Sequence, residues 1–165
     1  MRLLILLVVF VTNKAIVWRM NTRTDFEILQ FMPYLLNQAA DASSVEFQTY
    51  YKARYGMLRT EWRVLFHLGR YGRLTAREIC ERARIHKTKV SRAVAALEDK
   101  RFLNREEVAQ DRRREYLDLT PTGKKVFADL LRAAEKFDTD LMSKFSDAEV
   151  AVLRRMLVAI AGLKS

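Results

Sequence analysis

Two short helical patterns separated by a turn lie between Leu74 and Leu119, and this stretch constrains the fold of the 165-residue chain more than any other. Thr75 and Glu78 have the spacing of a capping box, in which each side chain satisfies a free backbone N–H at the start of a helix. The pattern predicts a first short helix from Thr75 onward, which ends in a turn at Arg84-Ile85.

The second predicted helix, which begins near His86, has two faces of opposite character. Val90, Val94 and Leu97 recur at helical spacing and form an apolar inner face. The small, cationic outer face carries Lys87, Thr88, Lys89, Ser91, Arg92 and Ala95. Such a face suits the major groove of double-stranded DNA, because cations reach phosphates, an arginine can bond guanine and small residues let base edges approach. We predict that these six residues, together with Thr75, contact DNA.

A hairpin with a cationic tip is predicted after the second helix. Residues 102–108 and 114–119 can each form a strand, and residues 109–113 lie between them. Burying unpaired arginines at this tip would be costly, whereas the narrow minor groove of DNA attracts them. We predict that Asp111, Arg112 and Arg113 belong to the DNA contact.

These motifs resemble those of one known family, the MarR-type winged helix-turn-helix transcriptional regulators. The resemblance covers roughly residues 26–163 and rests on Thr88-Lys89-Val90-Ser91-Arg92, Leu97-Glu98, Asp111-Arg112-Arg113 and Leu117-Asp118-Leu119-Thr120-Pro121-Thr122-Gly123, with Gly56 and Glu61-Trp62-Arg63-Val64-Leu65 upstream. In this family the hairpin is called the wing. The resemblance implies that Asp111 stabilises the wing and that Arg113 contacts the minor groove. The sequence departs from the family at Arg101, where a glycine usually ends the recognition helix, and at Leu58, where a capping Ser or Thr is common.

The predicted fold is mainly helical, an α+β winged helix-turn-helix unit with long helices near both termini. Further helices are expected over Asp25–Tyr55, Thr60–Tyr71, Thr120–Phe145 and Ser146–Leu163, with a short strand at Arg73-Leu74. We divide the chain into a hydrophobic extension (1–19), an N-terminal dimerisation helix (20–58), the winged helix (59–119) and C-terminal dimerisation helices (120–165). The terminal helices carry apolar stripes that are too long to be buried against so small a winged helix. We therefore predict a two-fold homodimer in which these helices of the two chains interlock.

The extension at residues 1–19 contains none of the motifs described above. Its apolar run, Leu3 to Val11, is shorter than the ~20 residues that a membrane span needs. A mis-assigned upstream start is our preferred interpretation, followed by an added hydrophobic helix at the dimer and then by a membrane anchor. We expect no membrane association.

Charge and cysteine content agree with a nucleic-acid-binding protein of the cytoplasm. The net charge is +10, and 16 of the 30 Lys and Arg residues lie between Arg59 and Leu119. Neutralising DNA phosphates releases counterions, which favours this concentration of charge, although a merely soluble basic surface is an alternative. The single cysteine, Cys80, excludes an internal disulfide and favours a reducing compartment. A small half-buried side chain is a better interpretation of Cys80 than a redox sensor.

The sequence lacks the patterns of catalytic and metal sites. His67 and His86 have no Cys or carboxylate at metal-ligand spacing, so a structural role is preferred for both. None of the five glycines forms a phosphate-binding loop, and Ser91 has no visible histidine partner. We therefore expect neither an enzyme nor a metal or other cofactor.

Aromatic residues near the first two helices are candidates for an effector site. The candidates are Tyr34, Tyr51, Tyr55, Trp62, Phe66 and His67. The resemblance implies a small aromatic or phenolic effector that lowers DNA affinity, whereas residue by residue a plain core role is the favoured alternative.

The sequence as a whole predicts a homodimeric transcriptional regulator that binds a palindromic DNA operator. Repression by occupancy, released by a small aromatic effector, is the preferred mechanism. The alternatives are a DNA-binding regulator without an effector and a helical protein-interaction module.

Overall fold

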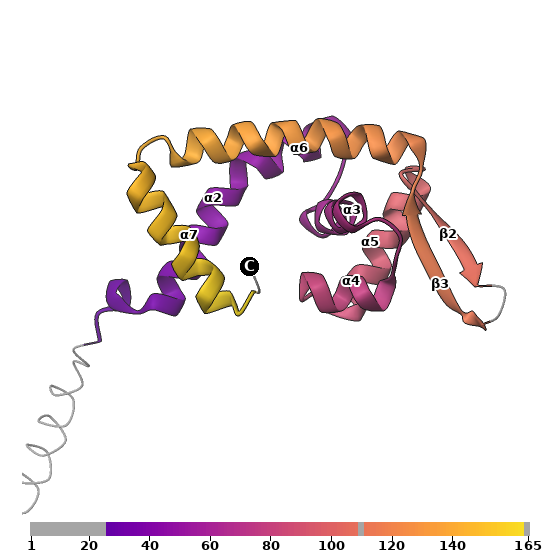
Figure 1. The fold of residues 1–165 in the computed structure, drawn as a ribbon, viewed down its shortest axis with the longest axis horizontal. Helices are drawn as coiled ribbons and strands as arrows, with labels where there is room; N and C mark the ends of the chain where they lie inside the picture. Colours follow the sequence, from indigo (N-terminus) through magenta and orange to yellow (C-terminus); the bar gives the residue numbers. More distant parts are fainter. Residues whose placement is uncertain (1–25, 109–110, 164–165) are drawn as a thin grey trace, which may run out of the picture. The chain divides into compact units, whose positions relative to one another are not determined.

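The computed structural model describes residues 26–108 and 111–163, apart from the side chains of residues 107–108 and 111–114 (Figure 1). The elements are η1 (Ile28–Gln30), α2 (Met32–Tyr55), α3 (Arg59–Tyr71), β1 (Leu74–Thr75), α4 (Ala76–Ala83), α5 (Lys87–Asp99), β2 (Leu103–Val108), β3 (Asp111–Leu119), α6 (Pro121–Met142) and α7 (Asp147–Ala161). The chain divides after Asp41 into two units, and each is described by itself. The predicted extension, residues 1–19, lies outside the described residues.

The N-terminal unit differs from the single helix predicted from Asp25 onward. A 3-10 turn comes first, Phe31 is extended, and α2 begins only at Met32. Pro33 explains the break, because its ring would clash with the carbonyl four residues earlier if a helix continued through it. The far end of α2 agrees with the prediction, since Gly56 follows it with a left-handed φ of 59°.

The helix-turn-helix begins and ends where its local sequence predicts. Thr75 and Glu78 form both hydrogen bonds of the capping box at the start of α4. Arg84, in a left-handed conformation with φ of 50°, ends α4. His86 then caps α5, because its imidazole accepts a hydrogen bond from the backbone N–H of Thr88. Short-range interactions therefore specify this motif.

The sheet has three antiparallel strands in the order β1-β3-β2. Leu117 of β3 lies opposite Leu74 of β1, and Leu103 of β2 lies opposite Leu119. The predicted five-residue tip is wrong, because β3 begins at Asp111, which pairs with Val108. The regular pairing ends where Glu107 lies opposite Glu115, and a register shift of the kind found at β-bulges then places Val108 opposite Asp111.

The core of the second unit lies between the helix-turn-helix, the sheet and the first half of α6. Its buried residues are Tyr51, Met57, Val64, Leu65, Leu68, Leu74, Ile79, Ala83, Ile85, Val90, Ala93, Val94, Leu97, Leu103, Leu117, Leu119, Val126 and Leu130. Thr120 caps α6 by accepting a hydrogen bond from the Gly123 N–H. A side chain at Gly123 would collide with the Phe102 carbonyl, which explains why this motif ends in glycine.

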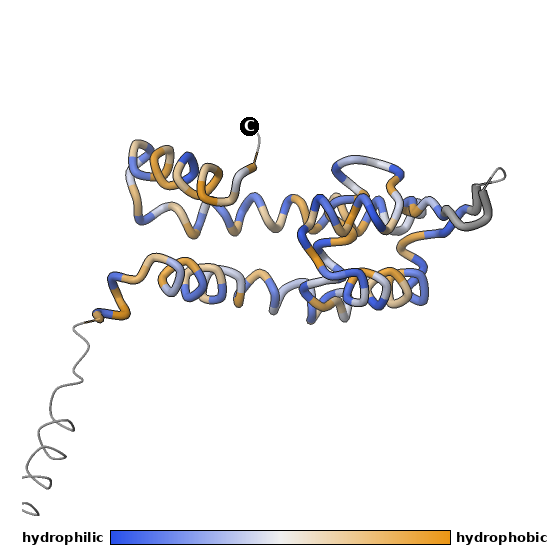
Figure 2. The backbone as a smooth tube through the Cα atoms, turned by 90° about the horizontal axis from the view of Figure 1, so that it is seen from below, coloured by the Kyte–Doolittle hydropathy of each residue, from blue (hydrophilic) through white to orange (hydrophobic). Residues whose placement is uncertain are grey.

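The last helix, α7, contributes no buried residue to the described protein. Ser146 and Glu149 form a capping box at its start, where the sequence predicts that a helix begins. Apolar residues recur along α7 between polar ones (Figure 2), and most of its large apolar side chains are exposed. Among the described residues, no helix combines the length and apolar character needed to cross a membrane.

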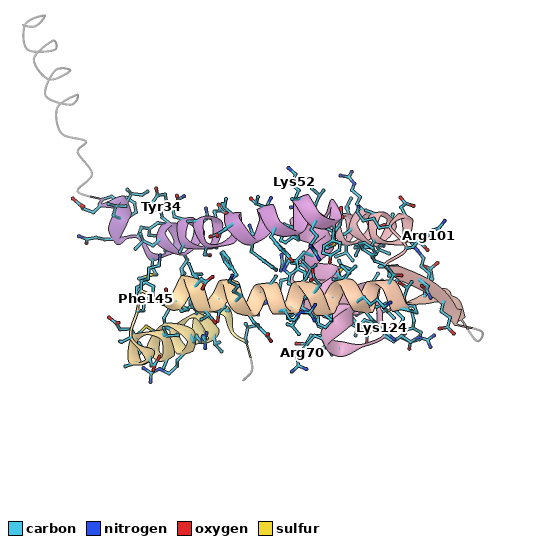
Figure 3. The ribbon with its side chains drawn as sticks, turned by 90° about the horizontal axis from the view of Figure 1, so that it is seen from above. Tyr34, Lys52, Arg70, Arg101, Lys124 and Phe145 are labelled. Carbon is cyan, nitrogen blue, oxygen red and sulfur yellow. The ribbon has the colours of Figure 1, made fainter. Side chains whose placement is uncertain are left out.

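Arg101 takes the left-handed conformation that ends the recognition helix, with φ of 60°, and its side chain projects outward (Figure 3). Its N–H bonds the Glu98 carbonyl, and the Phe102 N–H bonds the Leu97 carbonyl. A residue with a Cβ is strained in this conformation, whereas glycine is not. We expect Arg101→Gly to raise the free energy of unfolding by about 1 kcal/mol, measured by urea denaturation.

Asp99→Gly is the matched control, because Asp99 is exposed and lies two residues earlier in helical conformation. The control should lower stability, since glycine weakens a helix. A loss of stability in both variants would contradict the strain assigned to Arg101.

Candidate nucleic-acid interface

The recognition helix α5 separates its side chains as the sequence predicts. Val90, Ala93, Val94 and Leu97 are buried. The six predicted DNA contacts on the opposite face, Lys87, Thr88, Lys89, Ser91, Arg92 and Ala95, are exposed. The outer face is therefore available to a ligand as large as DNA.

The cations of this face remain available for phosphates and bases. Within the described part of the chain, Lys87, Lys89 and Arg92 form no ion pair. Ser91 and Ala95 are small, so the helix backbone can approach a groove closely. This combination of exposed cations and small residues is the one that major-groove binding requires.

Thr75 has a more local role. Its side chain is half-buried, and its hydroxyl both accepts a hydrogen bond from the Glu78 N–H and lies 2.8 Å from the Glu78 carboxylate. These bonds hold the start of α4. The structure thus places Thr75 beside the candidate interface with its hydroxyl already used in the helix cap.

The wing is joined to α5 by Arg105, a residue that no motif in the sequence includes. Its guanidinium lies 2.8 Å from the Glu98 carboxylate of α5 and 3.1 Å from the Glu115 carboxylate of β3. Asp111, Arg112 and Arg113 have their backbone in β3, but their side chains lie outside the described residues. Arg105 lies seven positions after Glu98 and on a different element, so no helical or strand periodicity relates the two, and only the fold reveals their contact.

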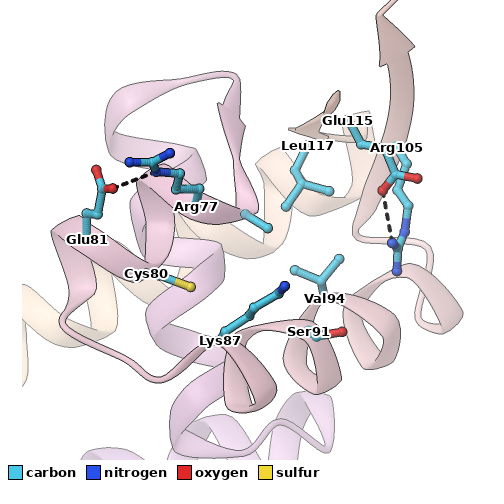
Figure 4. A pocket seen from close by; sticks show the side chains of 10 residues that line it. Arg77, Cys80, Glu81, Lys87, Ser91, Val94, Arg105, Glu115 and Leu117 are labelled. Carbon is cyan, nitrogen blue, oxygen red and sulfur yellow. Dashed lines mark hydrogen bonds and ion pairs between the residues drawn. The ribbon is translucent and has the colours of Figure 1, made fainter. Parts of the chain in front are cut away.

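A cavity of about 400 Å³ lies where α4, α5 and the strands meet (Figure 4). It is lined by Ala76, Arg77, Cys80, Glu81, Lys87, Ser91, Val94, Arg105, Glu115 and Leu117. The cavity brings two predicted DNA contacts, Lys87 and Ser91, together with the Arg105 bridge. Cys80 is half-buried on its wall, in agreement with the prediction of a small packed side chain.

The structure brings only part of the predicted effector site together. Trp62, Phe66 and His67 line a second, open cavity of about 290 Å³ with Arg63. Tyr51 instead belongs to the core, with 2% of its surface exposed. Tyr55 donates a 2.7 Å hydrogen bond to Asp129. Tyr34 belongs to the N-terminal unit.

Electrostatics in the second cavity disfavour further positive charge. Burial, followed by the nearby Arg63 and Arg82 guanidinium groups, lowers the pKa of His67. The pKa of Arg63 is lowered by its own burial and by Arg59. The described residues contain no cluster of three His, Cys, Asp or Glu side chains able to hold a metal ion.

Comparison with known proteins gives one consistent result. Residues 55–114 match the model of the MarR family. The chain is 26% identical over 126 residues to an uncharacterized HTH-type transcriptional regulator, YwaE, of Bacillus subtilis, covering 76% of this chain and 74% of the relative.

Solved structures share the fold. A MarR/EmrR family regulator from Acinetobacter sp. ADP1 aligns with a TM-score of 0.74 at 23% identity, over 83% of this chain and 96% of its own. BpsR of Bordetella bronchiseptica aligns with a TM-score of 0.75 at 18% identity, over 84% and 99%.

Residues 55–114 therefore resemble the MarR family. The matched family and the structural neighbours are transcriptional regulators and not enzymes. The resemblance seen in the sequence is confirmed, and so is the fold class of a mainly helical protein with a small antiparallel sheet.

The end of α5 is anchored by an ion pair whose carboxylate is buried. Glu61 of α3 is 5% exposed, and its carboxylate lies 3.1 Å from the Lys100 ammonium at the end of α5. In the sequence Glu61 stands out only as part of a motif, because its partner lies 39 positions further along the chain. The pair holds α5 against α3 and so orients the outer face of α5.

Replacing one member of this pair should lower the free energy of unfolding more than replacing both. Lys100→Met leaves the Glu61 carboxylate buried without its partner, so the free energy of unfolding should fall by about 2–3 kcal/mol, less than for a fully buried pair because Lys100 is partly exposed. The double variant Glu61→Met/Lys100→Met should recover at least half of that loss. Urea denaturation measures both, and a double variant less stable than Lys100→Met would refute this account.

Proposed function

We propose that this protein is a MarR-family regulator, a cytoplasmic homodimer that represses transcription by occupying a palindromic operator. The observation that carries the proposal is the division of α5 into a buried apolar face and an exposed cationic face. The outer face enters the major groove and contacts phosphates and base edges. The arginines of the wing, Arg112 and Arg113, lie in the adjacent minor groove, where Asp111 braces the wing.

The proposed dimer uses the helices outside the winged helix. On α7 the exposed apolar residues include Leu153, Leu157 and Ile160. In the N-terminal unit Phe26, Ile28 and Leu29 are exposed as well. Burying such side chains is favourable by roughly 25 cal/mol per Å², which supports dimerisation roles for residues 20–58 and 120–165 on either side of the winged helix, residues 59–119.

The proposed control is a small aromatic effector that binds the cavity beside Trp62 and Phe66. The structural neighbour BpsR has its DNA binding regulated by 6-hydroxynicotinic acid, a small aromatic acid. An effector that binds more tightly to a dimer with a half-site spacing unsuited to DNA would release the operator.

The roles of the proposed DNA contacts differ and can be separated. Arg92→Ala should cost ~1–3 kcal/mol on the best operator and flatten the base preference at one or two positions in each half-site. Arg113→Ala should weaken binding most on operators with narrow A·T-rich flanks, without changing major-groove preferences. Lys89→Ala should weaken all sequences alike and reduce the salt slope by about one unit.

Binding-site selection on each variant at fixed salt measures these effects, after folding and dimerisation have been checked. A salt titration of the unmodified protein comes first, because a DNA-binding protein loses affinity steeply with salt whereas a protein-interaction module does not bind DNA in this way. An Arg92→Ala protein that keeps every wild-type base preference would show that α5 is not the base-reading helix.

The proposed dimer can be broken by a charge on α7. Leu157→Glu places a carboxylate on the apolar face, where its burial without a partner would be costly, and should shift the protein to monomer at micromolar concentration. Arg155→Glu, an exposed position on the same helix, is the control and should remain dimeric. Sedimentation equilibrium distinguishes the two, and a dimeric Leu157→Glu protein would exclude α7 from the interface.

A further inference from the structure

The inner face of the sheet changes character where the wing leaves the core. Leu103 lies opposite Leu119, and both side chains are buried. The next pair on this face is Arg105 opposite Leu117, and Glu115 lies two residues before Leu117 on the same strand. Alternate residues of a strand share a face, so the apolar inner face gives way here to the charged side chains of Arg105 and Glu115. Among the described side chains, the hydrophobic core supports the wing only as far as Leu117.

Close packing does not fix the wing on the side of α5. The cavity of about 400 Å³ lies between α5 and the strands at this level, and Arg105, Glu115 and Ser91 are on its wall (Figure 4). Interdigitated side chains normally resist displacement of neighbouring elements. The open space therefore leaves the angle between α5 and the wing to polar contacts.

Arg105 supplies such a contact to two elements at once. Its Nε lies 2.8 Å from the Glu98 carboxylate in the last turn of α5, and its Nη1 lies 3.1 Å from the Glu115 carboxylate of β3. A planar guanidinium presents its donors in a fixed fork, so bonds to two carboxylates restrict direction as well as distance. Arg105 itself belongs to β2, and its side chain therefore joins three elements beside the open space.

The outer face of the wing is held by a different arginine. Arg73 lies 2.8 Å from the Glu106 carboxylate, and its guanidinium lies over the Tyr116 ring, 4.6 Å from the centroid. This contact connects the wing to the residue just before β1 and not to α5. Among the ion pairs of the described residues, only that of Arg105 joins the wing to α5.

We propose that Arg105 is a positioning residue that fixes the angle between α5 and the wing. This angle sets the distance along the DNA between the base pairs that α5 contacts in the major groove and the flanking pairs that the wing contacts in the minor groove. Arg105 thereby makes the protein selective for one spacing between these two parts of the operator. The inference rests on the proposed DNA contacts of α5 and the wing, and it adds a residue that determines specificity without contacting a base.

Operators that differ only in spacing test this role on the full chain. In each of them the A·T-rich flanks are moved by a single base pair toward or away from the half-sites that the wild-type protein selects. The wild type should bind the selected spacing about tenfold more tightly than either shifted operator, an effect of the size of one mismatched base pair. Arg105→Met should reduce this ratio to about twofold and keep the base preferences of the half-sites, because the outer face of α5 is unchanged.

Glu98→Gln distinguishes positioning from a direct contact with DNA. This variant keeps Arg105 and removes an acidic charge near the phosphates, which by itself would raise the affinity for every sequence. If Arg105 acts through Glu98, the variant should nevertheless lose the spacing preference, and the double variant should lose no more than either single one. The salt slope of Arg105→Met should equal that of the wild type, whereas loss of a phosphate contact would lower it by about one unit. Glu98→Gln also decides the matter if Arg105→Met does not fold.

Arg77→Met is the matched control. Arg77 lines the same cavity, but its ion pair, 2.9 Å from the Glu81 carboxylate, stays within α4. The substitution removes the same charge as Arg105→Met and should leave the spacing ratio at about tenfold, as in the wild type.

Three results would overturn the role of Arg105. The first is a spacing preference that survives in Arg105→Met or in Glu98→Gln. The second is a salt slope lowered by about one unit in Arg105→Met, which would make Arg105 a phosphate contact. The third is an equal loss of the preference in Arg77→Met, which would assign the effect to net charge. Failure of the proposed function differs from all three, because the wild type would then be indifferent to the position of the flanks, and the spacing role would fall with the wing contact.

Discussion

Burial of the inner face of α5 is the interaction on which the rest of the structure depends. Val90 and Leu97 are fully buried in a core shared with α3, α4 and the sheet. Each such side chain contributes roughly 1.5–3 kcal/mol when removed from water. Because a helix has a fixed angular repeat, burying this face also determines that Lys87, Lys89 and Arg92 face outward. The same packing therefore stabilises the protein and presents its cationic surface.

Ionic contacts then orient the recognition helix at three places. Lys100 joins its end to Glu61 of α3, and Arg105 joins its last turns to the wing. Arg63 holds the end of α4, just before the turn that leads into α5. Exposed ion pairs contribute little stability, but a pair of fixed geometry restricts the relative orientation of the elements that it joins. At these three positions a shift of a neighbouring helix or strand would change the orientation of α5.

The sequence was most informative wherever a structure depends on neighbours three or four residues apart. The capping box at Thr75, the start of a helix at Ser146 and the inner face of α5 were all predicted and are all present. The prediction failed at Phe31, because Pro33 delays the start of α2, and at Asp111, which pairs with Val108 beyond a register shift. Of the predicted effector residues, Trp62, Phe66 and His67 share a cavity, whereas Tyr51 is in the core.

The sequence by itself determined the helix-turn-helix, the exposed character of its cationic face and the resemblance to the MarR family. These features follow from capping, helical periodicity and short motifs, all of which act within one or two turns of chain. Only the tertiary structure decided which distant groups meet, such as Glu61 with Lys100, Arg63 with Ala83 and Tyr55 with Asp129. Each of these contacts joins residues at least 20 positions apart. Their meeting depends on how whole helices pack, which no local pattern of side chains encodes.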